Sequence, residues 1–379
     1  MTPQDAQAFE QLLANCADEP IRSPGAIQPH GVLLTLSEPE LRIQQISANV
    51  EALLGQPAAQ VLGQPLEQLL GDTDGQRIRE VLQLPRLSDA PPLHLAVNGA
   101  RFEGLLHRHQ GVLMLELEIQ LEHLQPQHLK EQTENLGRLL RRLQTAKTLN
   151  ELYTISVSEI QAMTGYDRVL IYRFEEEGHG QVIAEATRPT MEVFNGLFFP
   201  ASDIPQQARE LYRSNWLRII PNADYQPVPL LPALRPDTQQ ALDLSFATLR
   251  SVSPIHCQYM KNMGVLSSMS ISLLKGDQLW GLISCGNRQP LLVPHELRIA
   301  CQTIGQVLSL QISAMEALDI SRQREEKVAA LASLDQAMRD TPDSVFDGLT
   351  QVPQLLLELT QAGGAVSYTH LTLPTILLV

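Results

Sequence analysis

Apolar and polar residues alternate in several short runs along the first 120 residues, as they do in strands with one buried face. Gly-containing turns separate these runs, and the longer gaps carry short helical patterns. The predicted elements are strands at 32–36 and 41–46, short helices at 50–54 and 61–70, and a hairpin of strands 101–108 and 112–119 joined across 109–111. This part of the chain therefore predicts a small α+β unit with an antiparallel sheet.

The pattern repeats in a second unit, from about residue 151 to 317. Its predicted elements are a helix at 152–163 and strands at 168–174, 181–185, 269–274 and 279–284. Five prolines fall between positions 221 and 236, so we expect no regular structure there but a long loop held by its surroundings. The second unit is again predicted to be an antiparallel sheet with flanking helices.

A long helix is predicted over 295–340, because this segment holds no proline and lies between Pro294 and Pro342. Apolar residues recur along it at steps of three and four: Ile304, Leu308, Ile312, Met315 and Leu318. The stripe suits a helix shared between subunits or domains. The alternative, a helix that covers its own sheet, accounts for the first half, whereas 321–328 is too charged to be covered on all sides.

Charge and composition exclude several classes of protein. The 379 residues carry a net charge of −14 and no cluster of Lys or Arg, which disfavours binding to nucleic acid or an anionic membrane. The chain begins without a signal-peptide pattern, and no apolar run is long enough to span a membrane. Its sparse cysteines predict reduced thiols. We expect a cytoplasmic protein.

Candidate chemistry gathers in the second unit, where most of the aromatic residues lie between Tyr166 and Trp280, as in a pocket for a large flat ligand. Asp203 lies between Pro200 and Pro205; it is either an N-cap for the next helix or part of a rigid turn that aims carbonyls at a ligand. Arg250, Ser253, His256 and Tyr259 follow at three-residue steps, close to one helical face. Arg218 and Arg250 are each suited to gripping a carboxylate with two hydrogen bonds.

These segments carry a resemblance to a known family. Pro200-Ala-Ser-Asp-Ile-Pro205, the 250–259 block, Leu279-Trp-Gly-Leu-Ile-Ser-Cys285 and an N-terminal Cys16-Ala-Asp-Glu-Pro-Ile-Arg22 ahead of 25–31 resemble a bacteriophytochrome over roughly residues 10 to 360. The resemblance implies an α+β fold of PAS and GAF antiparallel sheets with flanking helices, a figure-of-eight knot and a long connecting helix. The 221–236 loop would encircle the N-terminal segment in that knot.

The resemblance also implies a division of the chain. The expected segments are an N-terminal anchoring arm at 1–25, a PAS domain at 26–125, a helical linker at 126–150, a GAF domain at 151–317, the connecting helix at 295–340, the start of a PHY domain cut short at 341–364, and a tail at 365–379. This tail is uncharged and breaks the preceding pattern, so we expect it to be non-native.

By the same resemblance, the chain is a red/far-red photoreceptor that binds biliverdin IXα in the GAF pocket through a thioether to Cys16. The residues that match the family's chromophore-binding positions are Cys16, Tyr172, Phe199, Asp203, Ile204, Pro205, Tyr212, Arg218, Arg250, Ser253, His256, Tyr259, Met263, Ser268 and Ser270. The arginines, Tyr212 and the serines correspond to propionate contacts, the Asp203 carbonyl to a pyrrole acceptor, and His256 to a neighbour of the central rings. The aromatic residues and Met263 correspond to the enclosure of the D ring, whose Z-to-E flip is the photochemical event.

The chain departs from the family after Cys285, where a His pair is usual and Gly286-Asn287 stands instead. The first His of that pair hydrogen-bonds the D-ring carbonyl, and an Asn287 amide is a partial substitute because it can donate a hydrogen bond. We predict that the chromophore binds but that photoproduct yield or dark reversion differs from that of relatives with His.

The resemblance further implies a homodimer through the connecting helix, with signalling to a downstream histidine kinase and response regulator that are absent from this chain. His295-Glu-Leu-Arg298 is a poor match to a kinase phosphoacceptor box, because Ile-Ala-Cys301 follows where Thr-Pro is expected. The alternative is a PAS/GAF sensor for another small ligand or haem, with His256 or Cys257 as axial ligand. The cysteines and His256 lack the spacing of a zinc site.

Overall fold

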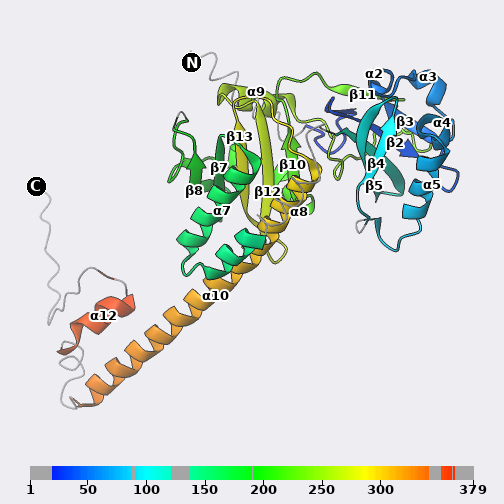
Figure 1. Ribbon diagram of the computed structural model, residues 1–379. Helices are drawn as coiled ribbons and strands as arrows, with labels where there is room; N and C mark the ends of the chain where they lie inside the picture. Colours follow the sequence, from blue (N-terminus) through cyan, green and yellow to red (C-terminus); the bar gives the residue numbers. More distant parts are fainter. Residues whose placement is uncertain are drawn as a thin grey trace, which may run out of the picture. The chain divides into compact units, whose positions relative to one another are not determined.

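The computed structural model describes residues 19–87, 90–120, 137–189, 191–340, 351–360 and 362 (Figure 1). The chain divides into two units, Met1–Leu310 and Gln311–Val379. Two antiparallel sheets make up the described core of the first unit. The predicted fold class is therefore confirmed. Within the described residues, no helix combines the length and the apolar character that crossing a membrane requires.

The first sheet has seven strands in the order β1-β11-β3-β2-β6-β5-β4. Their bounds are β1 Ala26–Ile27, β2 Gly31–Leu36, β3 Ile43–Ser47, β4 Leu93–Val97, β5 Ala100–His109, β6 Val112–Ile119 and β11 Val228–Leu231. The predicted hairpin is present, and its turn residues Gln110 and Gly111 both have positive φ, as a type I′ turn requires. Asn98 and Gly99 repeat this geometry between β4 and β5, a hairpin that the sequence patterns above did not include.

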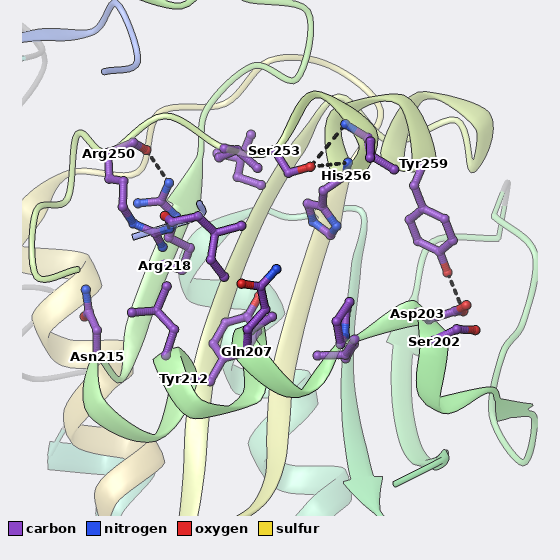
Figure 2. A pocket seen from close by; sticks show the side chains of 18 residues that line it. Ser202, Asp203, Gln207, Tyr212, Asn215, Arg218, Arg250, Ser253, His256 and Tyr259 are labelled. Carbon is purple, nitrogen blue, oxygen red and sulfur yellow. Dashed lines mark hydrogen bonds between the residues drawn. The ribbon is translucent and has the colours of Figure 1, made fainter. Parts of the chain in front are cut away.

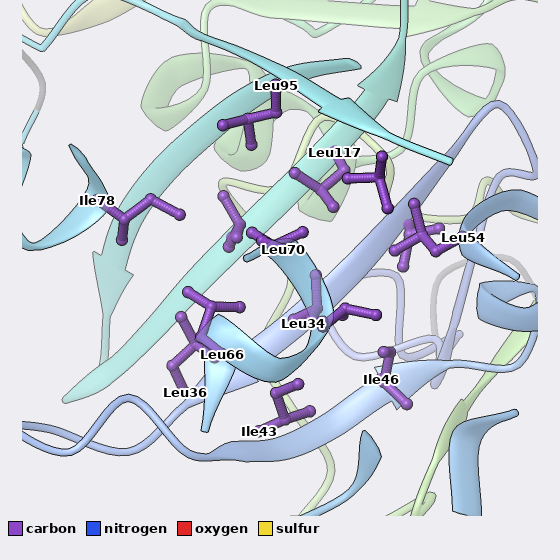
Figure 3. Packing of buried hydrophobic residues seen from close by; sticks show 14 of the residues in the cluster. Leu34, Leu36, Ile43, Ile46, Leu54, Leu66, Leu70, Ile78, Leu95 and Leu117 are labelled. Atoms are coloured by element: carbon purple, nitrogen blue, oxygen red, sulfur yellow. The ribbon is translucent and has the colours of Figure 1, made fainter. Parts of the chain in front are cut away.

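Short helices cover one face of this sheet and close its hydrophobic core (Figure 3). They are α2 Val50–Leu54, α3 Ala58–Val61, α4 Leu66–Leu70 and α5 Asp72–Val81. Leu34 and Ile46 from the strands meet Leu66 and Leu70 from α4 in this core, where all four side chains are buried. Strands β2 and β6 are buried along nearly their whole length, so their opposite face must be covered as well.

The second sheet has six strands in the order β10-β12-β13-β7-β8-β9. Their bounds are β7 Arg168–Phe174, β8 Gly180–Thr187, β9 Phe198–Phe199, β10 Leu217–Ile220, β12 Ser267–Lys275 and β13 Gln278–Asn287. Helix α7 (Leu149–Thr164) packs on β7 and β8 and begins at an N-cap, where the Thr148 side chain accepts from the Glu151 N–H at 3.2 Å. The antiparallel sheet with flanking helices that was predicted within 151–317 is therefore present.

The alternation of β12 separates the two faces of this sheet. Ile271 lies against helix α10 (His295–Asp340), and a Cβ added at Gly305 of α10 would come within 2.6 Å of the Ile271 Cγ2 atom. Ser270 points to the other face, which helices α8 (Gln206–Ser214) and α9 (Pro254–Asn262) cover together with the short 3-10 helix η2 (Ala201–Asp203). The candidate site lies on that second face.

The proline-rich segment returns to the first sheet and encloses the N-terminal segment. On one side, Ala26 and Ile27 pair with Pro229 and Val228 of β11. On the other side, the Leu244 N–H donates to the Arg22 carbonyl at 2.7 Å, and the Gln28 N–H donates to the Leu249 carbonyl at 2.7 Å. The loop thus holds residues 22–28 from two sides, as the expected figure-of-eight arrangement requires.

The prediction that the prolines exclude regular structure from this loop is wrong at β11. Pro229 has no N–H, but its carbonyl accepts from the Ala48 N–H at 2.9 Å, and the Leu230 N–H donates to the Gly25 carbonyl at 3.0 Å. A short strand tolerates proline where its neighbours do not need the missing donor.

Helix α10 is continuous from His295 to Asp340, as its flanking prolines predict. Within Met1–Leu310, Ile304 and Leu308 are buried, so the start of the apolar stripe covers its own sheet; Ile312 is also buried. Met315 is half-buried and Leu318 is 69% exposed. In the unit Gln311–Val379, α12 (Pro353–Thr360) is a further helix. The anchoring arm apart from its last residues, much of the predicted linker and PHY segment, and the 365–379 tail lie outside the described residues.

Candidate functional site

Two adjacent cavities lie between the second sheet and the segments that cover it, and Figure 2 shows the first of them between α8 and α9. They enclose about 1020 and 910 Å³ of empty space, including open solvent. Their shared wall consists of Asp203, Ile204, Tyr212, His256 and Tyr259.

Every described residue of the predicted binding set lines one of these cavities or both. The first is lined by Asp203, Ile204, Pro205, Tyr212, Arg218, Arg250, Ser253, His256 and Tyr259. The second is lined by Tyr172, Phe199, Asp203, Ile204, Tyr212, His256, Tyr259, Met263, Ser268 and Ser270. Cys16 lies outside the described residues. The fold therefore brings the predicted set together, while the role of each residue toward a ligand stays a prediction.

A pair of buried arginines forms one end of the first cavity (Figure 2). Arg218 on β10 is 8% exposed and donates to the carbonyls of Ala247, Thr248 and Arg250. Arg250 is 6% exposed, donates to the Ile21 carbonyl, and leaves its Nε without a hydrogen-bond partner.

Neither arginine forms an ion pair with any residue that the structure describes. Burial lowers the pKa of Arg218, and burial together with the charge of Arg218 lowers the pKa of Arg250 to about 8. Two buried like charges with carbonyl partners alone form a site for an anion.

Asp203 and Tyr259 lie at the opposite side of the first cavity (Figure 2). The Tyr259 hydroxyl donates to the Asp203 Oδ2 atom at 2.9 Å. Burial raises the pKa of Asp203, and this hydrogen bond acts against that rise. Pro205, not Asp203, is the N-cap of α8, so the side chain of Asp203 serves the cavity and the N-cap alternative is wrong.

The 250–259 block is not one helical face. Ser253 is the N-cap of α9, and its side chain accepts from the N–H groups of Ile255 at 3.2 Å and His256 at 3.4 Å. Arg250 lies before the helix begins, so its convergence on the cavity comes from the bend of the chain at Ser253. His256 and Tyr259 do lie on α9, with their rings stacked at 6.2 Å.

His256 is in the wall shared by the two cavities and is uncharged. Burial is the main cause that lowers its pKa to about 4, and the charge of Arg218 adds to the effect. A neutral imidazole keeps one donor and one acceptor for a ligand.

The second cavity is mainly aromatic. Tyr172 packs edge-on against Phe174 at 5.2 Å and lies 6.2 Å from Phe199. Gly180 of the neighbouring strand makes room for this ring, since an added Cβ would lie 2.1 Å from Tyr172. The Tyr172 hydroxyl is buried without a partner, and burial raises its pKa to about 12. This cavity therefore offers a flat apolar surface with an unmet hydroxyl group at Tyr172.

Arg168 is the cation of the second cavity's wall, and the sequence patterns did not single it out. It pairs with Glu185 at 2.9 Å, and its guanidinium lies 3.7 Å from the Phe194 ring centroid. This charge is balanced, unlike those of Arg218 and Arg250.

Further wall residues were not in the predicted binding set, although some of them stand in the quoted motifs: Ile21, Ser202, Gln207, Ala208, Leu211, Asn215, Ile220, Val252 and Ile255 in the first cavity, and Leu170, Val182, Phe194, Met260, Val265, Leu282, Ser284, Cys285 and Gly286 in the second. Steps of three and four residues from Tyr212 would have found Asn215 at the C-cap of α8 and Ala208 on the helix, and Gln207 and Leu211 are themselves four residues apart. Ile21 carried no such signal, because only the tertiary fold brings the N-terminal segment here.

The predicted substitution by Asn287 is wrong. Gly286 lines the second cavity but Asn287 does not. The Asn287 side chain accepts from the Asp167 N–H at 3.1 Å and donates to the Gln289 carbonyl at 2.9 Å, so its amide is committed to the neighbouring loops. Successive residues of a strand point to opposite faces of the sheet. A side chain at position 287 therefore cannot take the place of one at position 286.

Three other candidates for chemistry find no support in the described part of the chain. Cys257 packs in an apolar cluster with Ile220 and Met260 and does not line either cavity, so it is no axial ligand there. The described residues hold no group of His, Cys, Asp and Glu side chains suited to a metal ion. His295 lies at the first residue of α10, half-buried, which does not suit a phosphoacceptor.

Comparison with known proteins agrees with this architecture. The PAS fold family matches residues 16–120, and the GAF domain family matches residues 148–312. The chain is thus a PAS–GAF protein.

Among solved structures, a variant of the chromophore-binding domain of Stigmatella aurantiaca bacteriophytochrome in the Pr state is 48% identical, with a TM-score of 0.75 over 79% of this chain and 99% of that one. The photosensory core module of a Stigmatella aurantiaca phytochrome is 44% identical, with a TM-score of 0.82 over 92% of this chain and 69% of that one. This chain belongs to the phytochrome family.

Curated relatives include cyanobacterial phytochrome B of Nostoc sp., which is 41% identical over 94% of this chain and 48% of that protein. The bacteriophytochrome of Pseudomonas aeruginosa is 36% identical over 93% of this chain and 48% of that protein. The chain spans about half the length of these curated relatives.

Proposed function

We propose that this chain binds biliverdin IXα in the paired cavities and is the light-sensing part of a red/far-red photoreceptor. The observation that carries the proposal is the buried pair Arg218 and Arg250, which no described carboxylate neutralises, at one end of a site whose other end is aromatic. An open-chain tetrapyrrole with two propionates has this same division between anionic groups and flat apolar rings.

Unmet hydrogen-bonding groups in the cavities support the fit. The Arg250 Nε and the Tyr172 hydroxyl are both buried without partners, although buried polar groups are nearly always satisfied. These two groups lie in different cavities. A ligand that satisfies both must therefore extend from one cavity into the other, past the residues that line both.

Biliverdin supplies light absorption and a Z-to-E double-bond rotation when bound. The protein's own part is to hold and enclose it: the two arginines, with Tyr212, Ser253, Ser268 and Ser270, would hold the carboxylates. The Asp203 carbonyl would accept from pyrrole nitrogens, with Ile204 and Pro205 fixing that turn. Neutral His256 would lie by the central rings, while Tyr172, Phe199, Tyr259 and Met263 would enclose the terminal ring.

Attachment through Cys16 is part of this proposal. Ile21 lines the first cavity, and Arg250 donates a hydrogen bond to its carbonyl. The arm that carries Cys16 thus leads directly to the arginine end of the site. Because Asp18 and Glu19 are close to Cys16 in sequence and negative charge disfavours a thiolate, attachment would depend on a bound pigment held against the sulfur.

A pigment-binding assay tests the proposal. Purified protein is mixed with biliverdin, its red absorbance is recorded before and after red light, and the denatured chain is examined for retained pigment. We expect a red-absorbing band, a light-induced change, and retention that Cys16→Ala abolishes. A folded chain that stays colourless, or one that takes up haem and not biliverdin, would contradict the proposal.

We also propose the wider setting that the family implies: a cytoplasmic homodimer that signals to a histidine kinase and response regulator. The exposed apolar residues of α10 support dimerisation, since Leu310 is 73%, Leu318 is 69% and Ile320 is 63% exposed. Analytical ultracentrifugation of Leu310→Glu and Leu318→Glu variants tests it, with a shift from dimer to monomer expected.

A further inference from the structure

Strand β6 of the first sheet carries a buried carboxylate whose position packing alone does not explain. The Glu116 side chain is 1% exposed, on the same face as Val112 and Met114, which pack against Leu244 and Leu249. Burial raises the pKa of Glu116 to about 7. A carboxylate in such surroundings costs free energy unless hydrogen bonds stabilise it, whereas an apolar side chain there would not.

The hydrogen bonds that Glu116 accepts come from the segment that holds the arginines. The Thr248 N–H donates to its Oε1 at 3.1 Å, and the Leu249 N–H donates to its Oε2 at 2.7 Å. Arg250 follows directly. The carboxylate thus grips two consecutive backbone donors with its two oxygens.

The same two peptide groups hold Arg218 on their other side. The carbonyl of the 247–248 peptide accepts from the Arg218 Nη1 at 3.4 Å, and the carbonyl of the 248–249 peptide accepts from the same nitrogen at 3.3 Å. In a trans peptide the N–H and C=O point in opposite directions. Each of these peptides therefore bridges the carboxylate of Glu116 and the guanidinium of Arg218, with its dipole aligned between opposite charges.

We infer that Glu116, a residue of the PAS sheet, is a positioning residue for the arginine end of the ligand site. It acts through the peptides 247–249, holding Arg218 by their carbonyls and fixing the start of Arg250. The inference rests on the proposed function, because it assigns to these arginines the carboxylates of the pigment. The PAS sheet would then contribute to pigment affinity although Glu116 does not itself touch the pigment.

Glu118 provides a matched control. It lies two residues along the same strand and is equally buried, but its carboxylate pairs with Arg298 of α10, with one contact at 3.2 Å. Among the described residues, it has no hydrogen bond to 247–250. Loss of either carboxylate destabilises the fold, yet only Glu116 is expected to affect the arginines.

The test uses two pigments, biliverdin and its dimethyl ester, in which the propionates carry no charge. Equilibrium dissociation constants are measured by absorbance titration of the full chain in a Cys16→Ser background, so that binding is reversible. In the parent we expect biliverdin to bind more tightly than the ester. In Glu116→Gln we expect about a tenfold loss for biliverdin, about 1.4 kcal/mol, and less than twofold for the ester. In Glu118→Gln we expect the ratio of the two constants to stay at the parent value.

A selective loss for biliverdin supports the inference, because a merely structural role would weaken both pigments alike. An equal loss for both, or no loss, would overturn it. Should Glu116→Gln not fold, Glu116→Asp keeps the charge but shortens its reach, and the same selective loss is expected. If the parent binds neither pigment, or does not distinguish them, the proposed function or its arginine contacts fail first, and the inference fails with them.

Discussion

The two cavities of the site differ in what their walls lack. The first has buried positive charge without a negative partner, at Arg218 and Arg250, whereas the cation of the second, Arg168, is paired with Glu185 at 2.9 Å. The positive charge of the first cavity is therefore not balanced by any described carboxylate. The charge in the second cavity is balanced, but its apolar surface is left uncovered. Binding at one end should depend on ligand charge, and binding at the other on ligand shape.

The largest effect should come from removing a charge at the arginine end. We expect Arg218→Ala to weaken biliverdin binding about 100-fold, since hydrogen bonds between charged groups contribute ~1.5–3 kcal/mol. Phe199→Ala in the second cavity should weaken biliverdin and its dimethyl ester by equal factors. Absorbance titrations of both variants with both pigments compare the ends directly, and an ester as sensitive as biliverdin to Arg218→Ala would contradict the comparison.

The same unbalanced charge predicts a conflict between stability and binding. Arg250→Met removes a buried unpaired charge but keeps much of the volume, so we expect the pigment-free protein to become more stable by about 1 kcal/mol while its biliverdin affinity falls. Urea unfolding without pigment measures the first and titration the second. Arg298→Met is the control, because Arg298 is paired with Glu118 and its loss should destabilise. If Arg250→Met instead destabilises the pigment-free protein, the charge of Arg250 is already stabilised by its surroundings, and the prediction is wrong.

Shape should govern the second cavity, and two glycines test this. An added Cβ at Gly180 would lie 2.1 Å from the Tyr172 ring, whereas one at Gly286 would meet Val265 at 3.4 Å, an ordinary contact. We expect Gly180→Ala to destabilise the fold by about 2 kcal/mol and Gly286→Ala by less than about 0.5 kcal/mol, as measured by urea unfolding. Equal losses would mean that the Tyr172 ring moves aside freely.

His256, in the wall between the cavities, predicts a pH effect. Its pKa falls from 6.5 to about 4 on folding, so the unfolded state binds more protons in this interval. Stability should therefore be full above pH 6.5 and fall as the pH drops toward 4, by at most ~1.4 kcal/mol per pH unit from this group. His256→Gln should reduce this slope in urea unfolding between pH 4.5 and 6.5. His30 and His107, whose pKa values are also lowered to about 4, should keep part of the slope in that variant.

The smallest expected effect concerns Gly286, which stands where the family usually has His. A side chain there would enter the second cavity beside Val265 without backbone strain, so Gly286→His should leave the fold intact. We expect photoproduct yield or the rate of dark reversion to change several-fold, because a new hydrogen-bond donor would reach the terminal ring. Unchanged photoconversion and reversion after the substitution would argue against this prediction.

Much of the fold and site followed from local pattern. Strand-like apolar runs predicted β2, β6, β7 and β13, and the turn at Gln110-Gly111 joined the predicted hairpin of β5 and β6. The site residues on α8, α9 and β12 were predicted through resemblance and through the types of their side chains. Asn98-Gly99 shows a signal that was present but unused, since this dipeptide is the strongest short-range hairpin pattern.

What the sequence by itself determined is the set of elements and the chemical types in the site, because both depend on neighbours within a few positions. Only the tertiary structure decided that β11 joins the first sheet, that Ile21 reaches the cavity, and that Asn287 turns away from it. It alone placed Glu116 behind the peptides that hold Arg218, far along the chain. These contacts join segments more than a hundred residues apart, and their partners are chosen by burial and hydrogen-bond satisfaction in the whole fold, which no local pattern encodes.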